Sequence, residues 1–353
     1  GMMAKIRFSI TDKMWRFNVV TAQDGPKLVT EFMKEFACST KLKTRVAWNG
    51  GFILNPELVG KLGISERFTG SPLGLIISGG KVVSPPLYNK PAFLVNSDGK
   101  LEIKRVNCSK GLILTSGNHK ITLGPAVYNL SEPNDDPCFY DLLYQNQEIP
   151  GNGRILVRLA GNIIKDIKAT EKGEGIPVLP VGLTISFPTN KFPKGWEENS
   201  AVNVQMIGWP DYDAAIEAGP QYLDNGKVCI DMDVEGWKTL NSIRTQAARL
   251  DYLDSRGPKI AVGLDKNGDL VIITINGRIR ESVGATHHDI ANIMKSRGVR
   301  YAMGFDPGGS STLVIDGKTL NISPYNHRYE EDVYSLPPEP RAVANAFLLS
   351  EIN

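Results

Sequence analysis

The chain has 353 residues, enough for one large domain or two ordinary ones, and 41% of them are hydrophobic, as in a globular protein with a sizeable core. Its 40 Lys and Arg against 38 Asp and Glu give a net charge of +2, which excludes the strongly basic surface of many nucleic-acid binders and an acidic tail. The 35 Gly and 22 Pro are scattered, a pattern typical of many short strands and turns. The composition favours a β-rich protein.

Near the N-terminus, Leu28, Phe32 and Phe36 recur at helical spacing and predict a helix over residues 28–36. A short strand is expected at residues 44–48. The sequence Asn-Gly-Gly-Phe follows it directly, so a polar, glycine-rich turn ends this strand.

Two hairpins follow, because residues 75–83 hold a Gly-Gly turn between apolar runs and residues 92–103 hold an Asp-Gly turn between two more. Further strands are expected at residues 155–159 and 163–167. Residues 187–198 contain two prolines and a glycine and are expected to form a loop. This loop is also a candidate domain boundary, although no linker composition demands one.

In the C-terminal part, residues 259–264 and 270–275 flank the sequence Asp-Lys-Asn-Gly and predict another hairpin. Thr286 is expected to cap the start of a helix, and Gly298 to end it. An apolar run at residues 299–305 then predicts a buried strand.

The segment 305–312 reads Phe-Asp-Pro-Gly-Gly-Ser-Ser-Thr and lies before a second apolar run at residues 313–318. One carboxylate, two glycines and three hydroxyls suit a turn that holds an anion beside an acid/base group. If the strands before Asn49 and Asp306 are neighbours in a sheet, both side chains would face one ligand-binding mouth. The alternatives are a Gly-Ser hairpin without a ligand and, for Asn49, local capping of a Gly-Gly turn.

Two polar clusters contain side chains of the types that bind metals. His287 and His288 are adjacent, so they diverge on a helix and lack the i, i+4 spacing of paired ligands. The carboxylates Asp231, Asp233 and Glu235 lack the spacing of a calcium loop. We interpret these three as solvated charges and expect no metal.

Several other features are not expected to carry chemistry. The Ala-Gly-Pro bend at residues 218–220 is interpreted as architectural. The chain has no nucleophile elbow, Walker loop or dinucleotide-binding fingerprint. The cysteines have neither metal-site spacing nor the density of a disulfide scaffold, and we expect buried free thiols at Cys38, Cys108, Cys138 and Cys229.

The sequence carries few signals for a membrane or for a cellular compartment. No run approaches the roughly 18 apolar residues of a membrane-spanning helix. Residues 1–5 lead into no apolar signal core, so no signal peptide is expected in this chain. The compartment stays open.

Taken in order, these segments resemble the phosphodiester glycosidase family. The likeness covers roughly residues 45–349 and is densest after residue 215. The matching segments are residues 48–52, 218–220 with Leu223, 261–263, 305–306 with 308–312, and 341–346. The resemblance implies one α+β, strand-rich fold with helices packed on sheets and a surface cavity at strand ends. Residues 1–44 would form a helix and strand segment packed on a domain spanning residues 45–349.

The resemblance also implies a function. It is the hydrolysis of the anomeric C–O bond of a sugar-1-phosphodiester, such as a GlcNAc-1-phosphodiester, to a free sugar and a phosphomonoester. No cofactor, nucleic acid or membrane segment is implied, and a monomer or weak homo-oligomer is expected; relatives are often extracytoplasmic. The alternatives are a non-catalytic binder of phosphorylated glycans and an enzyme acting on a different phosphodiester-linked sugar.

The candidate catalytic residues are Asp306, which would stabilise or attack the sugar cation or activate water, and Asn49, which would hold a sugar or phosphate oxygen. The nearest candidates for a second carboxylate are Glu217 and Glu339. The resemblance implies that the substrate or its phosphate is held by Gly50, Gly51, Gly219, Lys259, Gly308, Gly309, Ser310, Ser311, Thr312, Arg341 and Asn345.

Two positions depart from the family pattern. Pro307 replaces a glycine, which removes one backbone N–H donor from the turn. Lys259 replaces an arginine and so keeps the positive charge but loses the two-pronged grip on phosphate oxygens. Both departures put the substrate or the efficiency of the reaction in question.

Overall fold

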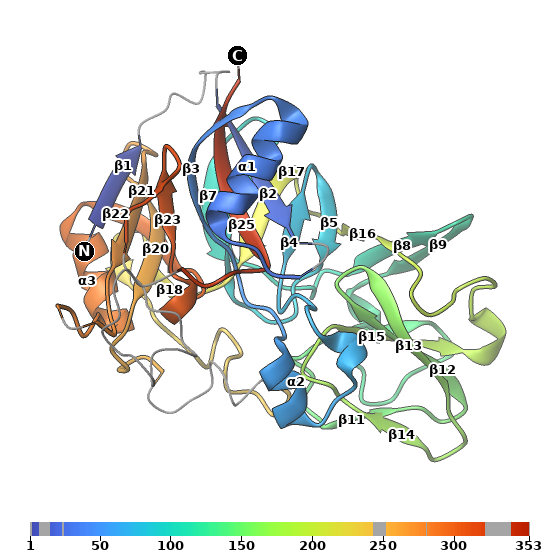
Figure 1. The fold of residues 1–353 in the computed structure, drawn as a ribbon. Helices are drawn as coiled ribbons and strands as arrows, with labels where there is room; N and C mark the ends of the chain where they lie inside the picture. Colours follow the sequence, from blue (N-terminus) through green and yellow to red (C-terminus); the bar gives the residue numbers. More distant parts are fainter. Residues whose placement is uncertain are drawn as a thin grey trace.

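The computed structural model describes residues 2–6, 15–22, 25–242, 252–279, 281–321 and 340–352. Within these residues, antiparallel sheets predominate and three α-helices pack against or between them (Figure 1). The helices are α1 (Val29–Thr40), α2 (Pro56–Leu62) and α3 (His287–Ser296). The α+β, strand-rich fold class is confirmed. No helix in this part of the chain is long and apolar enough to cross a membrane.

A five-stranded sheet joins the N-terminal strands to the C-terminal strand in the order β2-β25-β3-β23-β24. Its strands are β2 (Trp15–Thr21), β25 (Asn345–Glu351), β3 (Lys43–Asn49), β23 (Leu313–Ile315) and β24 (Lys318–Thr319). Helix α1 buries Val29, Phe32 and Met33 against this sheet and extends four residues beyond the predicted end. Because β3 pairs with both β25 and β23, the Asn49 end of β3 is held between two late segments of the chain.

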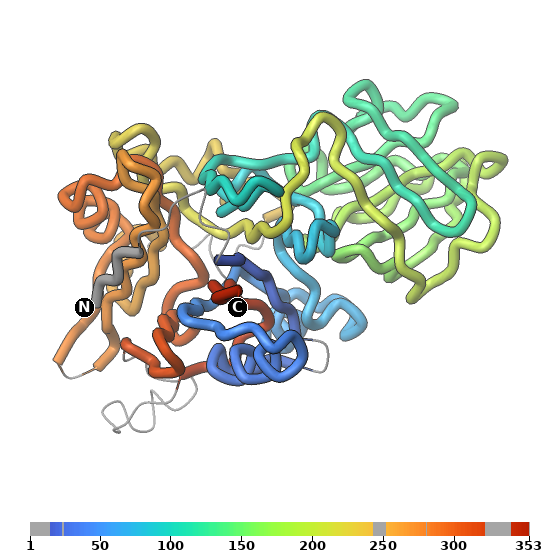
Figure 2. The backbone as a smooth tube through the Cα atoms, turned by 90° about the horizontal axis from the view of Figure 1, so that it is seen from above, coloured from blue at the N-terminus to red at the C-terminus, as the bar shows by residue number. Residues whose placement is uncertain are grey.

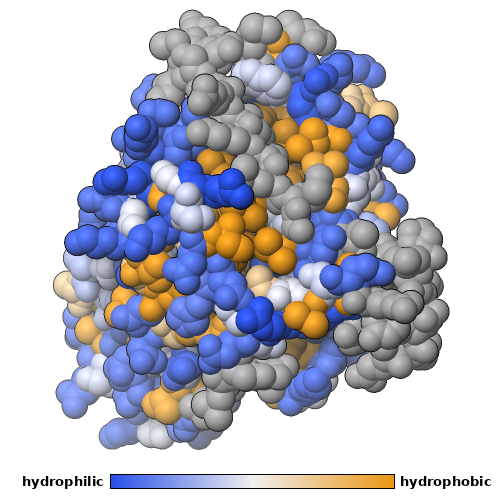
Figure 3. Space-filling view, turned by 90° about the vertical axis from the view of Figure 1, so that its left-hand side faces the viewer, coloured by the Kyte–Doolittle hydropathy of each residue, from blue (hydrophilic) through white to orange (hydrophobic). Residues whose placement is uncertain are grey.

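A six-stranded sheet has the order β1-β21-β20-β22-β18-β19, and α3 packs on it. Its strands are β1 (Met2–Ile6), β21 (Leu270–Ile275), β20 (Lys259–Asp265), β22 (Val299–Gly304), β18 (Gln221–Asp224) and β19 (Lys227–Val228). On the face nearest this sheet, apolar side chains gather among hydrophilic ones (Figure 3). The exposed large hydrophobic residues of the described part all lie between residues 228 and 301.

An eight-stranded sheet crosses the middle of the molecule in the order β7-β6-β17-β4-β5-β16-β8-β9. Its strands are β7 (Leu101–Arg105), β6 (Pro91–Asn96), β17 (Tyr212–Glu217), β4 (Ile76–Ser78), β5 (Lys81–Ser84), β16 (Asn203–Met206), β8 (Leu112–Ser116) and β9 (His119–Leu123). Strand β16 meets β5 through one residue pair, Val204 and Val82. The sheet therefore narrows to a thin connection at this point.

Residues 107–206, here called the inserted lobe, project to one side of the rest (Figure 2, green to yellow). The lobe has a core of its own that includes Val157, Phe187 and Trp196. Besides β8, β9 and β16, it contains β10 (Cys138–Tyr140), β15 (Leu183–Pro188), β12 (Arg154–Ala160), β13 (Ile163–Ala169), β11 (Glu148–Pro150) and β14 (Gly175–Pro177). The expected loop at residues 187–198 lies inside this lobe.

The predicted hairpins are confirmed as β4–β5, β6–β7 and β20–β21, and the strands expected at residues 155–159 and 163–167 are confirmed as β12 and β13. The helix cap is confirmed as well, since the Thr286 hydroxyl accepts the Asp289 amide at 2.9 Å. The cysteines are free thiols and Cys108 and Cys138 are buried as expected, but Cys229 is only half-buried and Cys38 is exposed, so the expectation of burial is wrong at Cys38. Cys38 lies on α1 outside the stripe that packs on the sheet.

Aromatic side chains lock three of the sheets together beneath the polar turns. Trp48 stacks on Phe347 with ring centroids 5.2 Å apart and meets Phe93 edge to face at 5.9 Å. Phe305 packs edge-on against Trp48 at 6.2 Å. Trp48 and Phe305 directly precede Asn49 and Asp306, so this packing fixes the two strand ends beside each other.

Candidate functional site

The turn after Phe305 has a backbone that its sequence explains. Pro307 is extended at φ −86°, which its ring permits, and Gly308 has φ +72°, which favours glycine. The Asp306 amide donates to the Gly50 carbonyl at 3.2 Å, and the Gly308 amide donates to the Pro258 carbonyl at 2.9 Å. The Gly308 amide is therefore already hydrogen-bonded inside the fold, and its role in holding a phosphate stays a prediction.

Asn49 ties this turn to strand β3. Its Nδ2 donates to the Asp306 carbonyl at 2.9 Å, and its Oδ1 accepts the Thr312 amide at 2.9 Å. The residue is 0% exposed. Because both ends of its amide bind backbone atoms, Asn49 is a positioning residue, and the expected contact with a sugar or phosphate oxygen is not what its geometry provides.

The Asp306 carboxyl group lies beside Arg341. The Arg341 Nη2 is 3.7 Å from Asp306 Oδ2 and donates a hydrogen bond to the Ser310 hydroxyl. The Asp306 side chain is 17% exposed. Burial raises the pKa of Asp306, while the Arg341 charge and a hydrogen bond with Ser310 oppose that rise. The turn thus presents a carboxylate and a guanidinium side by side.

Gly50 and Gly51 bring strand β25 against this turn. The Gly50 amide donates to the Asn345 carbonyl at 2.9 Å, and the Gly51 amide donates to Asn345 Oδ1 at 2.8 Å. A Cβ atom at Gly50 would lie 1.7 Å from Asn345 Oδ1. Only glycine allows the side chain of Asn345 to come this close.

Ser311, Thr312 and Gly309 serve mainly to shape the turn. The Thr312 hydroxyl donates to the Ser310 carbonyl at 3.1 Å, and the Asn321 side-chain Nδ2 donates to the Ser311 carbonyl at 2.6 Å. The Gly309 carbonyl accepts the Arg341 backbone amide at 3.3 Å. This last bond helps to place the guanidinium of Arg341.

Lys259 begins β20 on the other side of the turn. Its Nζ donates to the Ser255 carbonyl at 3.2 Å, and burial together with the nearby Arg278 charge lowers its pKa to about 8. The Arg278 guanidinium in turn lies against Gly308, where a Cβ atom would be 3.3 Å from Nη1. Lys259 and Arg278 therefore add positive potential behind the turn.

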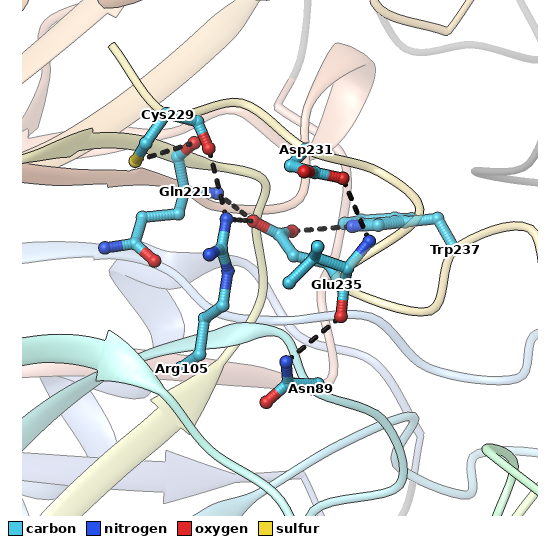
Figure 4. Close-up of polar contacts among 8 residues, drawn as sticks. Asn89, Arg105, Gln221, Cys229, Asp231, Glu235 and Trp237 are labelled. Carbon is cyan, nitrogen blue, oxygen red and sulfur yellow. Dashed lines mark hydrogen bonds and ion pairs between the residues drawn. The ribbon is translucent and has the colours of Figure 1, made fainter. Parts of the chain in front are cut away.

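A second polar group, missed at the sequence level, surrounds Glu235 (Figure 4). Its Oε1 accepts the Gln221 amide at 2.9 Å and lies 3.4 Å from Arg105 Nη2, and its Oε2 accepts the Trp237 indole at 2.7 Å. Glu235 is 0% exposed. Its interpretation as a solvated charge is wrong, because the chain folds the acidic loop back over Arg105. Asp231 and Asp233 do lie at the surface.

Glu217, a candidate second carboxylate from the sequence, and Lys90, which no sequence motif marks, extend this second group. Glu217 Oε2 accepts the Leu75 amide at 2.8 Å, whereas its buried Oε1 has no hydrogen-bond partner. The Lys90 ammonium lies 3.9 Å from the ring centroids of both Tyr88 and Trp237. Burial raises the pKa of Glu217 and lowers that of Lys90, and the attraction between their opposite charges partly offsets both shifts. The other candidate carboxylate, Glu339, lies outside the described residues.

Gly219 belongs to this second group and not to the Asp306 turn. A Cβ atom at Gly219 would lie 3.0 Å from the Trp237 ring and 3.2 Å from Glu235 Oε2. Its amide donates to the Gly304 carbonyl at 2.9 Å. Gly219 therefore contacts the surroundings of Glu235, while its backbone bond reaches Gly304, two residues before Asp306.

Two contacts link the two groups. Gly51 packs against the Glu217 carbonyl, which a Cβ atom would approach to 2.4 Å, while Gly50 binds the Asp306 amide. Tyr252 lies over Trp237 with centroids 5.4 Å apart, and its hydroxyl is buried without a partner. Burial raises the Tyr252 pKa, and the charges of Asp306 and Glu235 act in the same direction. Asp306 and Glu235 are therefore both near enough to Tyr252 to affect its pKa.

No group of three or more His, Cys, Asp or Glu side chains in the described ranges could hold a metal ion. His287 is buried, and its Nδ1 lies 2.8 Å from the Tyr222 hydroxyl. Burial and the Lys259 charge lower its pKa, so the ring stays neutral. It packs on Tyr252 with ring centroids 4.6 Å apart and supports that aromatic side chain.

Residues 145–350 match a family model described as phosphodiester glycosidase. A 154-residue stretch is 30% identical to the SPbeta prophage-derived uncharacterized protein YomE of Bacillus subtilis strain 168, covering 36% of this chain and 24% of that protein. The match therefore spans about a quarter of this relative's length.

Solved structures also resemble the fold. A hypothetical protein from Synechocystis aligns with a TM-score of 0.55 at 18% identity, over 99% of this chain and 61% of that one. The zebrafish N-acetylglucosamine-1-phosphodiester alpha-N-acetylglucosaminidase catalytic domain, auto-inhibited by its pro-peptide, aligns with a TM-score of 0.49 at 15% identity, over 99% and 88% of the two chains. At 18% identity, the likeness to the Synechocystis protein shows the fold alone.

Proposed function

Because the chain belongs to the phosphodiester glycosidase family, we propose that it hydrolyses a sugar-1-phosphodiester at the anomeric carbon. Water adds to that carbon, the bond from the carbon to the bridging phosphate oxygen breaks, and the bridging oxygen leaves with the phosphate. The products are a free sugar and a phosphomonoester, and the proton released from water ends on the phosphate or in solvent. A GlcNAc-1-phosphodiester is the model substrate.

The observation that carries this proposal is the pairing of Asp306 with Arg341 and Ser310. Cleavage of an anomeric C–O bond builds positive charge on the sugar, which a carboxylate stabilises, attacks, or serves by activating water. The leaving phosphate is negative and is best met by a guanidinium and a hydroxyl. Asp306 and Arg341 supply these opposite groups 3.7 Å apart.

The leaving group also explains why no strong general acid is needed here. A phosphate oxygen is a weak base, so stabilising its charge matters more than protonating it. Arg341 and Ser310 take that role, and the charges of the buried Lys259 and the half-buried Arg278 strengthen the positive potential behind them. Asn49 contributes by holding both ends of the turn in place.

One observation favours the alternative of a non-catalytic glycan binder. Pro307 has no N–H group, and the Gly308 amide is bound to the Pro258 carbonyl, so the turn offers fewer backbone donors than expected. Such a site would bind a phosphorylated glycan mainly through side chains. The two functions differ in whether product is formed.

The test compares Asp306→Asn with a matched control, Asp316→Asn. Asp316 is exposed, pairs with Arg45 and has φ +48°, a conformation that asparagine adopts readily. We expect the wild type to release GlcNAc from the model diester and Asp306→Asn to lose at least about 1000-fold in turnover, or about 4 kcal/mol in the barrier. Asp316→Asn should keep its activity, and both variants should melt like the wild type.

Two other outcomes would contradict parts of the proposal. Wild-type turnover in Asp306→Asn would refute the assignment of that carboxylate. Saturable binding of the diester by the wild type, with no release of sugar over long incubation, would replace hydrolysis by the binding function.

A further inference from the structure

A large groove lies between the inserted lobe and the main sheets, apart from the carboxylate of Asp306. Its volume is about 1260 Å³, above the roughly 300–1,000 Å³ of ordinary small-ligand pockets. Its walls come from the β4–β5 hairpin, the segments that flank α2, the β12–β13 turn and the chain entering β16. A volume of this size suits several linked sugar units better than one.

The lining of this groove is unusual in its charge. None of its 30 residues is Asp or Glu, although the chain's average acidic content would place about three there. Hydroxyl and amide side chains alternate with Pro, Val, Ile and Ala. Such a mixture provides hydrogen-bond partners for sugar hydroxyls and apolar surface for the C–H faces of sugar rings.

The two charged residues that line the groove are lysines from different sheets, Lys81 on β5 and Lys165 on β13. Neither ammonium forms a salt bridge with a residue that the structure describes. The neighbouring carboxylate of Asp166 faces away toward Arg67 at 3.5 Å and Arg158 at 3.8 Å. Both lysines therefore keep their positive charge available to a ligand.

Two further residues point to a ligand. Ser71 lines the groove, is buried, and has a hydroxyl without a hydrogen-bond partner. Asn345 also lines the groove, and its Oδ1 accepts the amide of Gly51 beside the turn that holds Asp306. The groove therefore borders the proposed active site through one side chain.

We propose that this groove binds the chain of a phosphate-bearing polysaccharide, with sugar rings on its apolar walls and phosphodiester groups at Lys81 and Lys165. The proposal rests on the proposed function and deepens it: the substrate is a polymer, and the groove holds the part that is not cleaved. Charge complementarity favours this occupant over a neutral glycan, which would leave both ammonium groups without a counter-charge.

The binding test uses the full chain with Asp306→Asn, so that bound polymer is not consumed. The probes are yeast phosphomannan and the same mannan after removal of its phosphate, both titrated by calorimetry. The groove variant is Lys81→Ser with Lys165→Ser, and the matched control is Lys172→Ser with Lys266→Ser, which removes the same charge from exposed positions outside the groove. A third variant, Asn203→Trp, obstructs the groove without changing charge.

We expect the groove variant and Asn203→Trp each to weaken phosphomannan binding at least about tenfold, and the control to change it less than about twofold. Dephosphorylated mannan should bind more weakly than phosphomannan to the unmodified groove. Unchanged affinity in the groove variants would overturn the proposal. Equally tight binding of dephosphorylated mannan would overturn its anionic component.

A kinetic arm separates this proposal from the proposed function. With Asp306 intact, the groove variants should keep kcat/KM for the small GlcNAc-1-phosphodiester and lose it only for a phosphodiester-linked polymer. If the wild type hydrolyses neither substrate while lysine-dependent binding of phosphomannan persists, hydrolysis is refuted and the groove stands. If hydrolysis proceeds and the groove variants cleave both substrates normally, the groove is refuted and hydrolysis stands.

Discussion

The Asp306 turn and the Glu217–Glu235 group lie on opposite sides of Gly50 and Gly51, yet they are built in different ways. The turn is one contiguous segment, and its carboxylate keeps 17% of its side chain exposed beside Arg341. The second group gathers Lys90, Glu217 and Glu235 from distant parts of the chain into the interior. The first arrangement leaves a charge available for chemistry, and the second arrangement uses charges to hold sheets together.

The largest effect on stability should come from the second group. Glu235→Ala leaves the Gln221 amide and the Trp237 indole without their acceptor in the interior. It also removes the carboxylate beside Arg105, which keeps its hydrogen bond to the Cys229 carbonyl. We expect a loss of about 3–5 kcal/mol in the free energy of unfolding, measured by equilibrium urea denaturation. Asp233→Ala, two residues away and exposed, should stay within about 0.5 kcal/mol of the wild type.

Glu235→Ala and Asp233→Ala together test whether the buried second group, unlike the Asp306 turn, mainly stabilises the fold. Asp306→Asn should lose activity and keep its stability, whereas Glu235→Ala should lose stability first. Equal losses for Glu235→Ala and Asp233→Ala would show that the buried group does not hold the sheets together.

A smaller effect is expected where the two regions meet. A Cβ atom at Gly51 would lie 2.4 Å from the Glu217 carbonyl and 3.1 Å from Ile216 Cγ2, so Gly51→Ala must displace backbone. We expect a loss of about 1–3 kcal/mol in unfolding free energy together with reduced turnover. Gly60→Ala, in α2 with open space around it, should instead gain roughly 0.5–1 kcal/mol. Full activity in a stable Gly51→Ala protein would separate the two regions functionally.

The smallest effect concerns pH. Burial raises the pKa of Glu217, so the folded protein holds this proton above the range in which the unfolded chain releases it. Its contribution to stability is complete below the ordinary value near 4.5 and is lost as the pH rises through the raised pKa. Between pH 4.5 and about 8, the wild type should therefore lose up to about 1.4 kcal/mol of unfolding free energy per pH unit relative to Glu217→Gln.

The measurement is the unfolding free energy of the wild type and of Glu217→Gln at about pH 5, 6 and 7. In this range the unfolded chain has released the Glu217 proton and the folded protein still holds it. The wild type should therefore lose stability relative to the variant as the pH rises. The neutral glutamine keeps the size and the acceptor oxygen of the side chain while removing its titration. Parallel pH profiles for the two proteins would contradict a raised pKa at Glu217.

Local chemistry explains which parts of the fold could be predicted. The Gly79–Gly80 turn has φ values of +55° and +75°, as a tight hairpin requires, and Thr286 with Asp289 forms a complete helix cap. Helix α2 was missed although its signal was present, since Asn55 precedes Pro56 and accepts the Leu58 amide at 2.8 Å. The inserted lobe was missed because its boundaries carry no change in composition.

The residues of the candidate site also differ in whether the sequence could predict their roles. The contiguous turns around Gly50 and Asp306 could be found because their glycines and hydroxyls are adjacent in sequence. The roles of Asn49 and Glu235 could not be predicted. The hydrogen-bond partners of Asn49 lie more than two hundred residues away in the sequence. Glu235 meets Arg105 only because its loop folds over that residue. Spacing shows which side chains are present, and packing decides which of them stay available to a ligand.

The most direct test of the account is product analysis in water labelled with oxygen-18. Hydrolysis of a GlcNAc-1-phosphodiester by the wild type should place the heavy oxygen on the anomeric carbon of the free sugar and leave the phosphomonoester unlabelled, as read by mass spectrometry. Heavy oxygen in the phosphate would contradict the account, because it would mean that the P–O bond is the one broken.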